Sequence, residues 1–332
     1  MTDHITLAHG SGGRDYRELV ETIFAPAFQN EFLSPLTDAA ILPAGEHIAM
    51  TTDGFVVTPL FFPGGDIGRL AVCGTVNDLA VSGAIPRYLS CAMVLETGLP
   101  VETLRRVVDS MARTAREAGV VIVTGDTKVV EQGGCAGIYI TTAGVGVFPA
   151  NAVIPPQQPQ AGDVILCTSP IASHGMAVMA ARHNLSFDPA IESDVRPLNY
   201  AIRAVLDAGV DVRAMRDPTR GGVAGTLNEW AGSALDITIS ESALPVRADA
   251  RAACEILGID PVYVANEGVA LFSLPEKQAQ IALSALQAIE GCAEAAIIGS
   301  VTAGRGNVYA KTQIGTFRRI LPPSGELLPR IC

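Results

Sequence analysis

The sequence lacks several features that define common protein classes. Charged residues make up only 17% of its 332 residues, and the formal net charge is −11. A chain without excess positive charge cannot displace the counterions around nucleic-acid phosphates, so we expect no nucleic-acid partner. The apolar runs are shorter than a membrane span, and no basic segment followed by an apolar one opens the chain. We therefore expect a soluble cytoplasmic protein with no membrane partner.

Two ligand-binding patterns are also missing. The chain contains no Gly-x-x-x-x-Gly-Lys-Ser/Thr loop, and Gly144-Val145-Gly146 lacks the rest of a dinucleotide-binding motif. The seven cysteines include no Cys-x-x-Cys pair, which argues against a structural zinc site. Six of them lie among apolar or small residues, as buried thiols do, whereas Cys332 is the last residue printed. If the protein binds a nucleotide, it does so through residues other than these two motifs.

Length and composition predict two domains. Apolar residues account for 48% of the chain, enough for a large core, and 332 residues are many for a single core. Residues 151–162 hold three prolines and three glutamines without an apolar period, and we interpret them as a linker. Domains are therefore expected over residues 1–150 and 163–316. Residues 317–332 contain three prolines and a glycine, which predicts a flexible tail.

Hydrophobic periodicity predicts an α/β first domain and a second domain with strands and helices. The clearest helix follows Pro100 and ends before Gly119, because apolar residues recur there at helical spacing. Strands are expected in the first domain over residues 49–52, 55–58, 86–95 and 120–124, with another apolar helix over 66–82. The second domain is expected to contain strands over 163–168, 269–274 and 295–301 and helices near 175–183, 197–208, 223–235 and 275–289.

Acidic residues stand at the ends of elements or inside apolar segments. Asp53 follows an apolar strand, Asp126 follows another, and Asp217 precedes a helix. Asp78 lies with Asn77 in the apolar stretch GTVNDLAVSGA, where an unpaired carboxylate would be costly to bury. Carboxylates that converge on Mg²⁺ bridging phosphates would meet that cost. Helix capping or turn formation is the alternative for each aspartate taken alone.

Three further segments are candidates for chemistry. The segment His9-Gly10-Ser11-Gly12-Gly13 could fold its backbone N–H groups over phosphates, or could simply lead into a helix. Glu267 interrupts apolar residues, so it could have a raised pKa and act as a general acid or base, or form a structural ion pair. Cys332 ends a proline-stiffened arm that could reach into a site and withdraw, although its position at the end could also be incidental.

Together these segments resemble the HypE family, the carbamoyl dehydratases of nickel–iron hydrogenase maturation. The resemblance runs from residues 9–13 to Cys332, through PLFFPGGDIGRLAVCGTVNDLAVSGAIPRYLSCAMVLE, VTGDTKVV, RDPTRGGV, ANEG and LPRIC. It implies a PurM-like fold, that of aminoimidazole ribonucleotide synthetase. In this fold an N-terminal α/β domain forms a homodimer through its sheets and binds ATP beside that interface. A C-terminal α+β domain completes the site.

The resemblance also implies a reaction. The terminal cysteine accepts a carbamoyl group from the HypF carbamoyltransferase, and ATP-dependent dehydration converts it to a thiocyanate. The cyanide then passes to iron on the HypC–HypD scaffold complex. Nucleotide-binding roles fall on Gly10, Ser11, Gly12, Gly13, Asn77 and Asp126. The Mg²⁺ ligands would be Asp53, Asp78 and Asp217, and the catalytic groups Cys332, Glu267 and Lys128.

Three alternatives remain at this point. Selenophosphate synthetase and aminoimidazole ribonucleotide synthetase share the fold, but neither explains Cys332. A carrier without catalytic activity would explain the thiol, but it would not need acidic residues inside apolar segments. ATP turnover by the carbamoylated protein distinguishes these alternatives.

Overall fold

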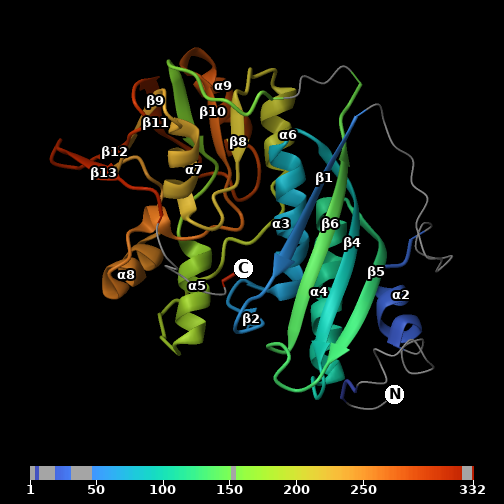
Figure 1. Ribbon diagram of the computed structural model, residues 1–332. Helices are drawn as coiled ribbons and strands as arrows, with labels where there is room; N and C mark the ends of the chain where they lie inside the picture. The colour runs from blue at the N-terminus through green and yellow to red at the C-terminus, as the bar shows by residue number, and fades with distance from the viewer. Residues whose placement is uncertain (1–3, 7–18, 31–46, 151–154, 324–330) are drawn as a thin grey trace.

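The chain folds into two domains, each built on one main β-sheet (Figure 1). The computed structural model describes residues 4–6, 19–30, 47–150, 155–323 and 331–332. The glycine-rich segment with Gly10, Ser11, Gly12 and Gly13 lies outside these residues, as do 151–154 of the linker and 324–330 of the tail. Within the described part of the chain, no helix is both long and apolar enough to cross a membrane.

The first domain contains a four-stranded sheet in the order β1-β6-β4-β5. Its strands are β1 (Ile48–Phe55), β4 (Ile85–Glu96), β5 (Val121–Val130) and β6 (Ile138–Val147). The pair β4 and β5 is parallel and joined by helix α4 (Val101–Ala118), whereas β6 runs antiparallel to both of its neighbours. Gly119 ends α4 in the left-handed conformation, as the sequence predicted.

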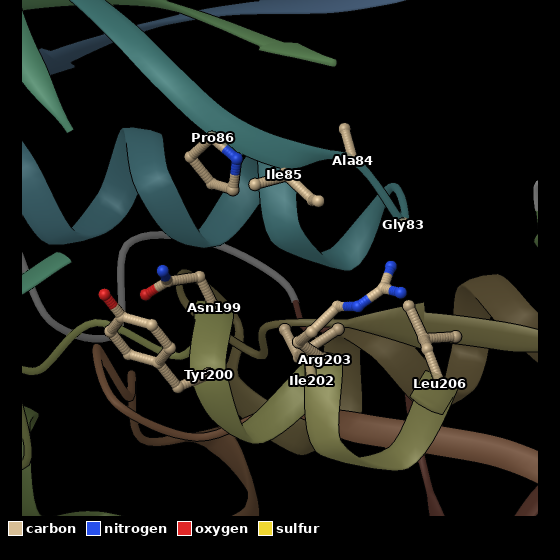
Figure 2. Close-up of a pocket in the computed structure, with 9 residues that line it drawn as sticks. All are labelled: Gly83, Ala84, Ile85, Pro86, Asn199, Tyr200, Ile202, Arg203 and Leu206. Carbon is tan, nitrogen blue, oxygen red and sulfur yellow. The ribbon is translucent and has the colours of Figure 1, made fainter. Parts of the chain in front are cut away.

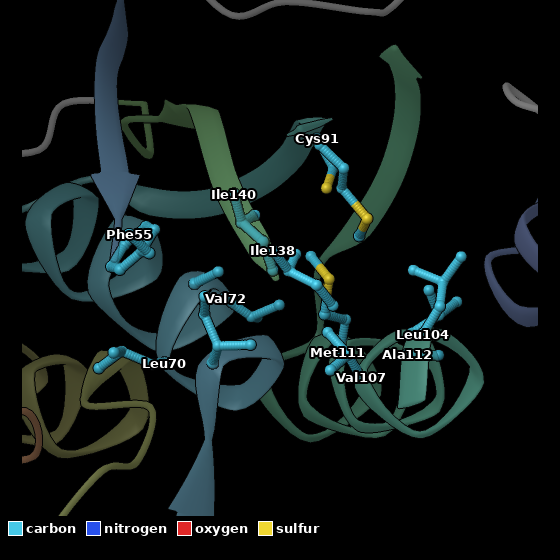
Figure 3. Close-up of a cluster of buried hydrophobic side chains, with 14 of the residues drawn as sticks. Phe55, Leu70, Val72, Cys91, Leu104, Val107, Met111, Ala112, Ile138 and Ile140 are labelled. Carbon is cyan, nitrogen blue, oxygen red and sulfur yellow. The ribbon is translucent and has the colours of Figure 1, made fainter. Parts of the chain in front are cut away.

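Helices α3 (Ile67–Val81) and α4 cover one face of this sheet and form the domain core with it (Figure 3). The predicted apolar face of α4 is confirmed, because Leu104, Val107 and Met111 are fully buried. Each such side chain contributes roughly 1.5–3 kcal/mol through burial. Asp66 begins α3 by accepting hydrogen bonds from the backbone N–H groups of Gly68 and Arg69.

The opposite face of the sheet carries alternating exposed residues along β1. Met50 is 72% exposed and Ile48 is 52% exposed, and both alternate with residues that face α3. The sequence predicted a break near Asp53-Gly54, and this was wrong, because β1 continues to Phe55. Pairing with β6 along the whole of β1 outweighs the turn preference of the Asp-Gly pair.

Short elements complete the first domain. A π-helical segment (Val20–Phe24) leads into α2 (Ala25–Ala27), and both pack against α4. A hairpin of β2 (Phe61–Phe62) and β3 (Gly65–Asp66) extends toward the second domain, where β2 contacts α5.

The second domain contains a seven-stranded sheet in the order β13-β12-β9-β11-β7-β10-β8. The strands are β7 (Asp163–Cys167), β8 (Ala214–Arg216), β9 (Leu235–Ser240), β10 (Leu271–Pro275), β11 (Ala296–Ala303), β12 (Val308–Lys311) and β13 (Phe317–Ile320). All of its pairs are antiparallel except β9 with β12. Residues 317–320, assigned to the tail from the sequence, thus belong to this sheet, and the extended part begins at Leu321.

Helices cover both faces of the second sheet. One face packs against α5 (Ser173–Arg182), α7 (Gly222–Ala231) and α8 (Ala248–Leu257), and the other against α6 (Asn199–Asp207) and α9 (Ala279–Gln287). Two short 3₁₀ helices span Pro261–Tyr263 and Glu276–Gln278. The sequence did not predict β8, β9, β12 or α8, which are short or lack a regular apolar period.

The two domains share their cores. Val178, Val195, Ala265 and Ile331, all outside the first domain, lie in the same buried cluster as the residues around α3 and α4. In return, Ala80 and Val81 at the end of α3 pack into the cluster beneath α6 and α9. The interface is therefore built from interpenetrating side chains rather than from two flat surfaces.

Candidate active site

A group of acidic side chains meets the chain's C-terminal residues where the two domains join. The first domain contributes Asp53 from β1 and Asp78 from α3, and the second contributes Asp217 and Glu267 from loops. The C-terminus lies between the domains (Figure 1). The structure therefore brings together these four acidic residues that the sequence singled out separately.

Asp53 and Asp78 are positioned by the helix-facing side of β1. Thr51 donates its hydroxyl hydrogen to Asp78 Oδ2 at 2.8 Å, and Thr75 donates to Asp53 Oδ2 at 3.4 Å. Burial, followed by the negative charge of Asp78, raises the pKa of Asp53 to about 6. Asp78 is partly exposed, whereas its apolar neighbours in the sequence suggested that it would be buried.

Asp217 lies in the loop between β8 and α7 and is buried. Burial first, and the charges of Asp78 and Asp53 after it, raise its pKa to about 7. Such a shift means that these carboxylates repel one another with little positive charge between them. Two arginines oppose this repulsion, since Arg220 lowers the pKa of Asp53 and Arg216 lowers that of Asp217.

The segment Asn266-Glu267-Gly268 presents one carboxylate on a rigid backbone. Asn266 is fully buried and holds neighbouring loops together, accepting from the Ala172 N–H at 2.7 Å and donating to the Pro218 carbonyl at 2.9 Å. At Gly268 a Cβ atom would lie 1.8 Å from the carbonyl oxygen of Asp194, so only glycine fits. This close approach fixes the backbone at Gly268, and with it the direction in which the Glu267 side chain points.

Glu267 is the most strongly perturbed carboxyl group of the site. It is 2% exposed, and its Oε1 has no hydrogen-bond partner among the described residues. Burial first, and then the charges of Asp217 and Asp194, raise its pKa well above the ordinary value. A buried carboxyl oxygen left unpaired in this way is costly, which marks it as a group kept for a ligand or a proton. The predicted raised pKa of Glu267 is therefore confirmed.

Asp194 accepts a hydrogen bond from the backbone of Glu267. Asp194 was not identified as a site residue from the sequence. Its Oδ1 accepts from the Glu267 backbone N–H at 2.9 Å, whereas its Oδ2 is buried without a partner among the described residues. Burial raises the pKa of Asp194 to about 6. No motif flagged it, because it lies in an irregular segment between α5 and α6.

The thiol of Cys332 lies next to this acidic group. Burial and the charge of Glu267 raise the pKa of Cys332 to about 12, and Arg220 partly opposes this effect. The thiol is therefore protonated at neutral pH in this position. Ile331 is 4% exposed and packs in the first domain's core cluster, which Cys332 also contacts.

The side chain of His174 contacts the backbone of Ile331 near the end of the chain. Its Nε2 lies 2.7 Å from the carbonyl oxygen of Ile331, and its Nδ1 lies 2.8 Å from Ser193 Oγ. Burial lowers the pKa of His174 to about 4, so the ring is neutral. A carbonyl can only accept, so Nε2 carries the hydrogen and Nδ1 accepts from the Ser193 hydroxyl.

Asn77 connects the domains instead of facing a ligand. Its amide hydrogens are donated to the carbonyl oxygens of Arg196 at 3.1 Å and Glu267 at 3.2 Å, and its Oδ1 accepts from the Leu198 N–H at 2.8 Å. Both donors are thus used by backbone atoms. This geometry argues against the nucleotide contact predicted for Asn77, because no amide hydrogen is left for a phosphate or a base.

Asp126 and Lys128 lie apart from the acidic group of the same chain. They form an exposed ion pair on β5, with Lys128 Nζ 3.0 Å from Asp126 Oδ2. The register Gly54–Thr141–Ala92–Asp126 crosses three strand spacings, or about 14 Å. Both side chains alternate with the buried Thr127 and so project from the open face, opposite to the face covered by helices. One chain alone does not bring Lys128 to Cys332.

The carboxylate oxygens of the acidic group suit a hard divalent cation, for which they would supply some of the ligands. Among the described residues, no three His, Cys, Asp or Glu side chains are arranged closely enough to form a complete metal site. Magnesium needs only one or two protein carboxylates when phosphates and water supply the remaining ligands. The raised pKa values of Asp53 and Asp217 show negative charge that a cation would offset. These residues therefore fit Mg²⁺ that is bound together with a phosphate group.

A separate pocket lies between the domains at the end of α3 (Figure 2). It has a volume of about 110 Å³ and lies between the start of β4 and helix α6. Its lining is mostly apolar and contains none of the acidic residues described above: Gly83, Ala84, Ile85, Pro86, Asn199, Tyr200, Ile202, Arg203 and Leu206. We therefore place the chemistry at the acidic group and not in this pocket.

Sequence and fold are both similar to known proteins. Residues 36–148 match the family described as AIR synthase related protein, N-terminal domain, and residues 160–311 match its C-terminal domain. The chain is 47% identical over 335 residues to the carbamoyl dehydratase HypE of Rhodobacter capsulatus, covering 99% of this chain and 98% of that protein. A crystal structure of the hydrogenase maturation protein HypE in complex with ATP matches with a TM-score of 0.94 and 44% identity, covering 98% of this chain and 99% of that one. A chain in the crystal structure of a HypE–HypF complex matches with a TM-score of 0.80 and 45% identity, covering 92% and 99%.

Proposed function

Because the chain belongs to the HypE family of carbamoyl dehydratases, which act in hydrogenase maturation, we propose that its dehydration takes place on its own Cys332. The observation that carries this proposal is the position of the Cys332 thiol beside Glu267 and the acidic group. A thiol that served only to pack against the core would not need acidic side chains around it. Its position is explained if a group attached to the sulfur reacts there.

The proposed reaction converts an S-carbamoyl group into a thiocyanate. The carbamoyl oxygen attacks the γ-phosphorus of ATP, and ADP leaves, which turns a poor leaving group into a phosphate ester. One N–H proton is lost as the C=N bond forms. Loss of the second N–H proton, together with cleavage of the C–O bond, leaves S–C≡N and inorganic phosphate. The overall balance is carbamoyl thioester plus ATP giving thiocyanate, ADP, phosphate and one proton.

Glu267 is the proposed acceptor of the nitrogen protons. Its unpaired Oε1 and the effect of its charge on the Cys332 thiol support this role. A carboxylate with a raised pKa is a stronger base once it is ionised. Positive charge arriving with the nucleotide would favour that ionised form.

Mg²⁺ that accompanies ATP is proposed to bind at Asp53, Asp78 and Asp217, with one or two of these carboxylates as direct ligands at a time and with phosphates and water as the others. When bound, the ion would neutralise phosphate charge and so favour attack by the carbamoyl oxygen. The ATP complex of a HypE relative supports binding of the nucleotide by this chain. We also propose that Gly10, Ser11, Gly12 and Gly13, outside the described residues, contact its phosphates through their backbone N–H groups.

The docked thiol and the acceptor thiol are proposed to be two positions of one arm. A thiol with a pKa of about 12 is a poor nucleophile at neutral pH, so Cys332 would accept its carbamoyl group away from the acidic group. The HypE–HypF complex supports the HypF carbamoyltransferase as the donor. Transfer of cyanide to iron on a HypC–HypD complex is the proposed following step. This cycle needs a reduced thiol, which favours the cytoplasm as its location.

A homodimer formed through the open face of the first sheet is the proposed assembly. This face carries Met50 and Ile48 as exposed apolar side chains, which need cover. It also carries Asp126 and Lys128, so a second copy packed face to face would bring these charges toward the other chain's site. That arrangement would give Lys128 its proposed role near the transferred phosphoryl group.

Mass spectrometry of the full-length protein tests the reaction. The chain is incubated with a carbamoyl transferase system, with and without ATP, and the peptide 327–332 is released by cleavage after Glu326. We expect one added carbamoyl group on Cys332 before ATP and loss of one water after it, and neither in Cys332→Ala. A stable carbamoyl group with no ATP-dependent loss of water would instead support a silent carrier. A modification on any other cysteine would refute the proposal.

A further inference from the structure

One contact at the domain junction has no part in the reaction described above. The imidazole of His174, fully buried at the start of α5, lies 2.7 Å from the carbonyl oxygen of Ile331. It touches neither the thiol nor the carboxyl group of Glu267 in any hydrogen bond of the described residues. Its partner is a main-chain atom, so the contact does not depend on which side chain stands at residue 331.

Two residues, Ser193 and Phe62, fix the ring of His174 apart from the tail. Ser193 donates to Nδ1, and the backbone N–H of Val195 donates to the same Ser193 oxygen at 3.1 Å. Phe62 packs edge-on against the ring with the centroids 5.5 Å apart and the planes at 83°. The Ser193 backbone is itself held by the Pro63 carbonyl. The ring thus presents one N–H in a defined direction before the tail arrives.

The Ile331 side chain supplies the second half of the contact. It is 4% exposed and belongs to the same buried cluster as Phe62, Val178 and Val195, which surround the start of α5 and the hairpin. Burial of such a side chain contributes roughly 1.5–3 kcal/mol. The backbone carbonyl of Ile331 lies beside this apolar cluster and would have no hydrogen-bond donor without His174.

We propose that His174 is a positioning residue that docks the tail by its main chain at residue 331 and so sets the place of Cys332 beside Glu267. The inference rests on the proposed reaction at Cys332. Recognition through the carbonyl tolerates any group attached to the sulfur, since the thiol, the carbamoyl form and the thiocyanate share the same backbone. His174 thus holds the arm through each chemical stage while Glu267 and the acidic group act on its end.

Alkylation of Cys332 by N-ethylmaleimide measures how often residues 331–332 leave their docked position beside His174. The docked thiol is protonated and largely covered, so the rate follows the undocked fraction. We expect the rate in His174→Ala to rise by roughly tenfold, as one buried hydrogen bond to a main-chain atom requires. In His174→Gln the amide supplies both a donor and an acceptor, and the rate should return to within about twofold of the original. His183→Ala, exposed at the other end of the same helix, is the matched control and should leave the rate unchanged.

A stability cycle separates docking from a purely structural role. His174→Ala is made in the full chain and in a chain shortened to end at Arg330, and the thermal midpoints are compared. We expect the loss of stability to be clearly smaller in the shortened chain, because the contact with residue 331 is already absent there. An equal loss in both backgrounds overturns the proposal, as does an unchanged alkylation rate in His174→Ala.

Single-turnover dehydration links the contact to the reaction. With Cys332 already carbamoylated, His174→Ala should slow the ATP-dependent loss of water, because the arm is docked less often and is placed less precisely when it is docked, while ATP affinity and carbamoyl loading stay unchanged. Unchanged dehydration in that variant also overturns the positioning role. Failure of Cys332 to become carbamoylated in the original chain would refute the proposed function instead, and would leave the alkylation and stability results unaffected.

Discussion

Replacing Asn77 by alanine distinguishes a bridge between domains from a nucleotide ligand. The substitution removes three hydrogen bonds to main-chain atoms of the second domain and leaves two carbonyls and one N–H without these partners. At about 0.5–1.5 kcal/mol for each bond, the free energy of unfolding should fall by roughly 2–4 kcal/mol. With an unfolding entropy of about 2.1 cal/mol/K per residue, that corresponds to a fall in thermal midpoint of about 3–6 °C.

Asn77→Asp sharpens the test. The carboxylate keeps an acceptor for the Leu198 N–H, but it places negative charge against the carbonyl oxygens of Arg196 and Glu267. We therefore expect Asn77→Asp to be less stable than Asn77→Ala at pH 7, and part of the difference should disappear at pH 4, where the new carboxyl group is protonated.

Thermal unfolding and calorimetric ATP titration decide between the two roles. The matched control is Asn228→Ala, since the Asn228 amide donates to the Ala224 carbonyl within its own helix and to the Ile320 carbonyl of the same domain at 3.4 Å, and its loss should cost about 1–2 kcal/mol. If Asn77→Ala keeps the original thermal midpoint and loses only ATP affinity, the bridge is refuted and the nucleotide contact inferred from the sequence stands.

Two further predictions concern charge and assembly. Because the folded pKa of Asp217 is raised to about 7, its contribution to stability is fully present below the unfolded value near 4 and is lost as the pH rises through about 7. Chemical denaturation of the nucleotide-free chain should therefore show stability falling over this range, and Asp217→Asn should flatten the fall; an equally steep fall in that variant would contradict this reading. On the open sheet face, Met50→Arg should convert a dimer to monomers in sedimentation analysis, whereas Ile314→Arg, exposed at 87% in the second domain, should not; a dimer that survives Met50→Arg would exclude this face.

The sequence predicted the architecture well where the signal was local. Helix α4 carries its own apolar period, its own start at Pro100 and its own stop at Gly119, so no knowledge of neighbours was needed. Strand β1 was misjudged at Asp53-Gly54, because its continuity depends on pairing with β6, almost 90 residues away. Short strands such as β8 are likewise defined by their partners and not by their own residues.

The site divides in the same way. Asp78 and Glu267 were found because a carboxylate among apolar residues is conspicuous in any sequence. Asp194 and His174 were missed as members, because their importance lies in contacts with Glu267 and Ile331, far along the chain. The role of Lys128 was inferred from the family resemblance, and the direction of its side chain could be known only once the register with β4 was seen.

Because the two domains share their hydrophobic cores, partial unfolding of one domain should disturb the packing of the other. Residues 178, 195, 265 and 331 complete the cluster around α3 and α4, and the end of α3 completes the cluster beneath α6. Neither sequence-defined half is therefore an independent folding unit, and a fragment cut at the linker would expose two incomplete cores. In hydrogen-exchange experiments the slowest amides of α3 and α6 should report one common opening free energy, since each helix loses its packing when the other departs.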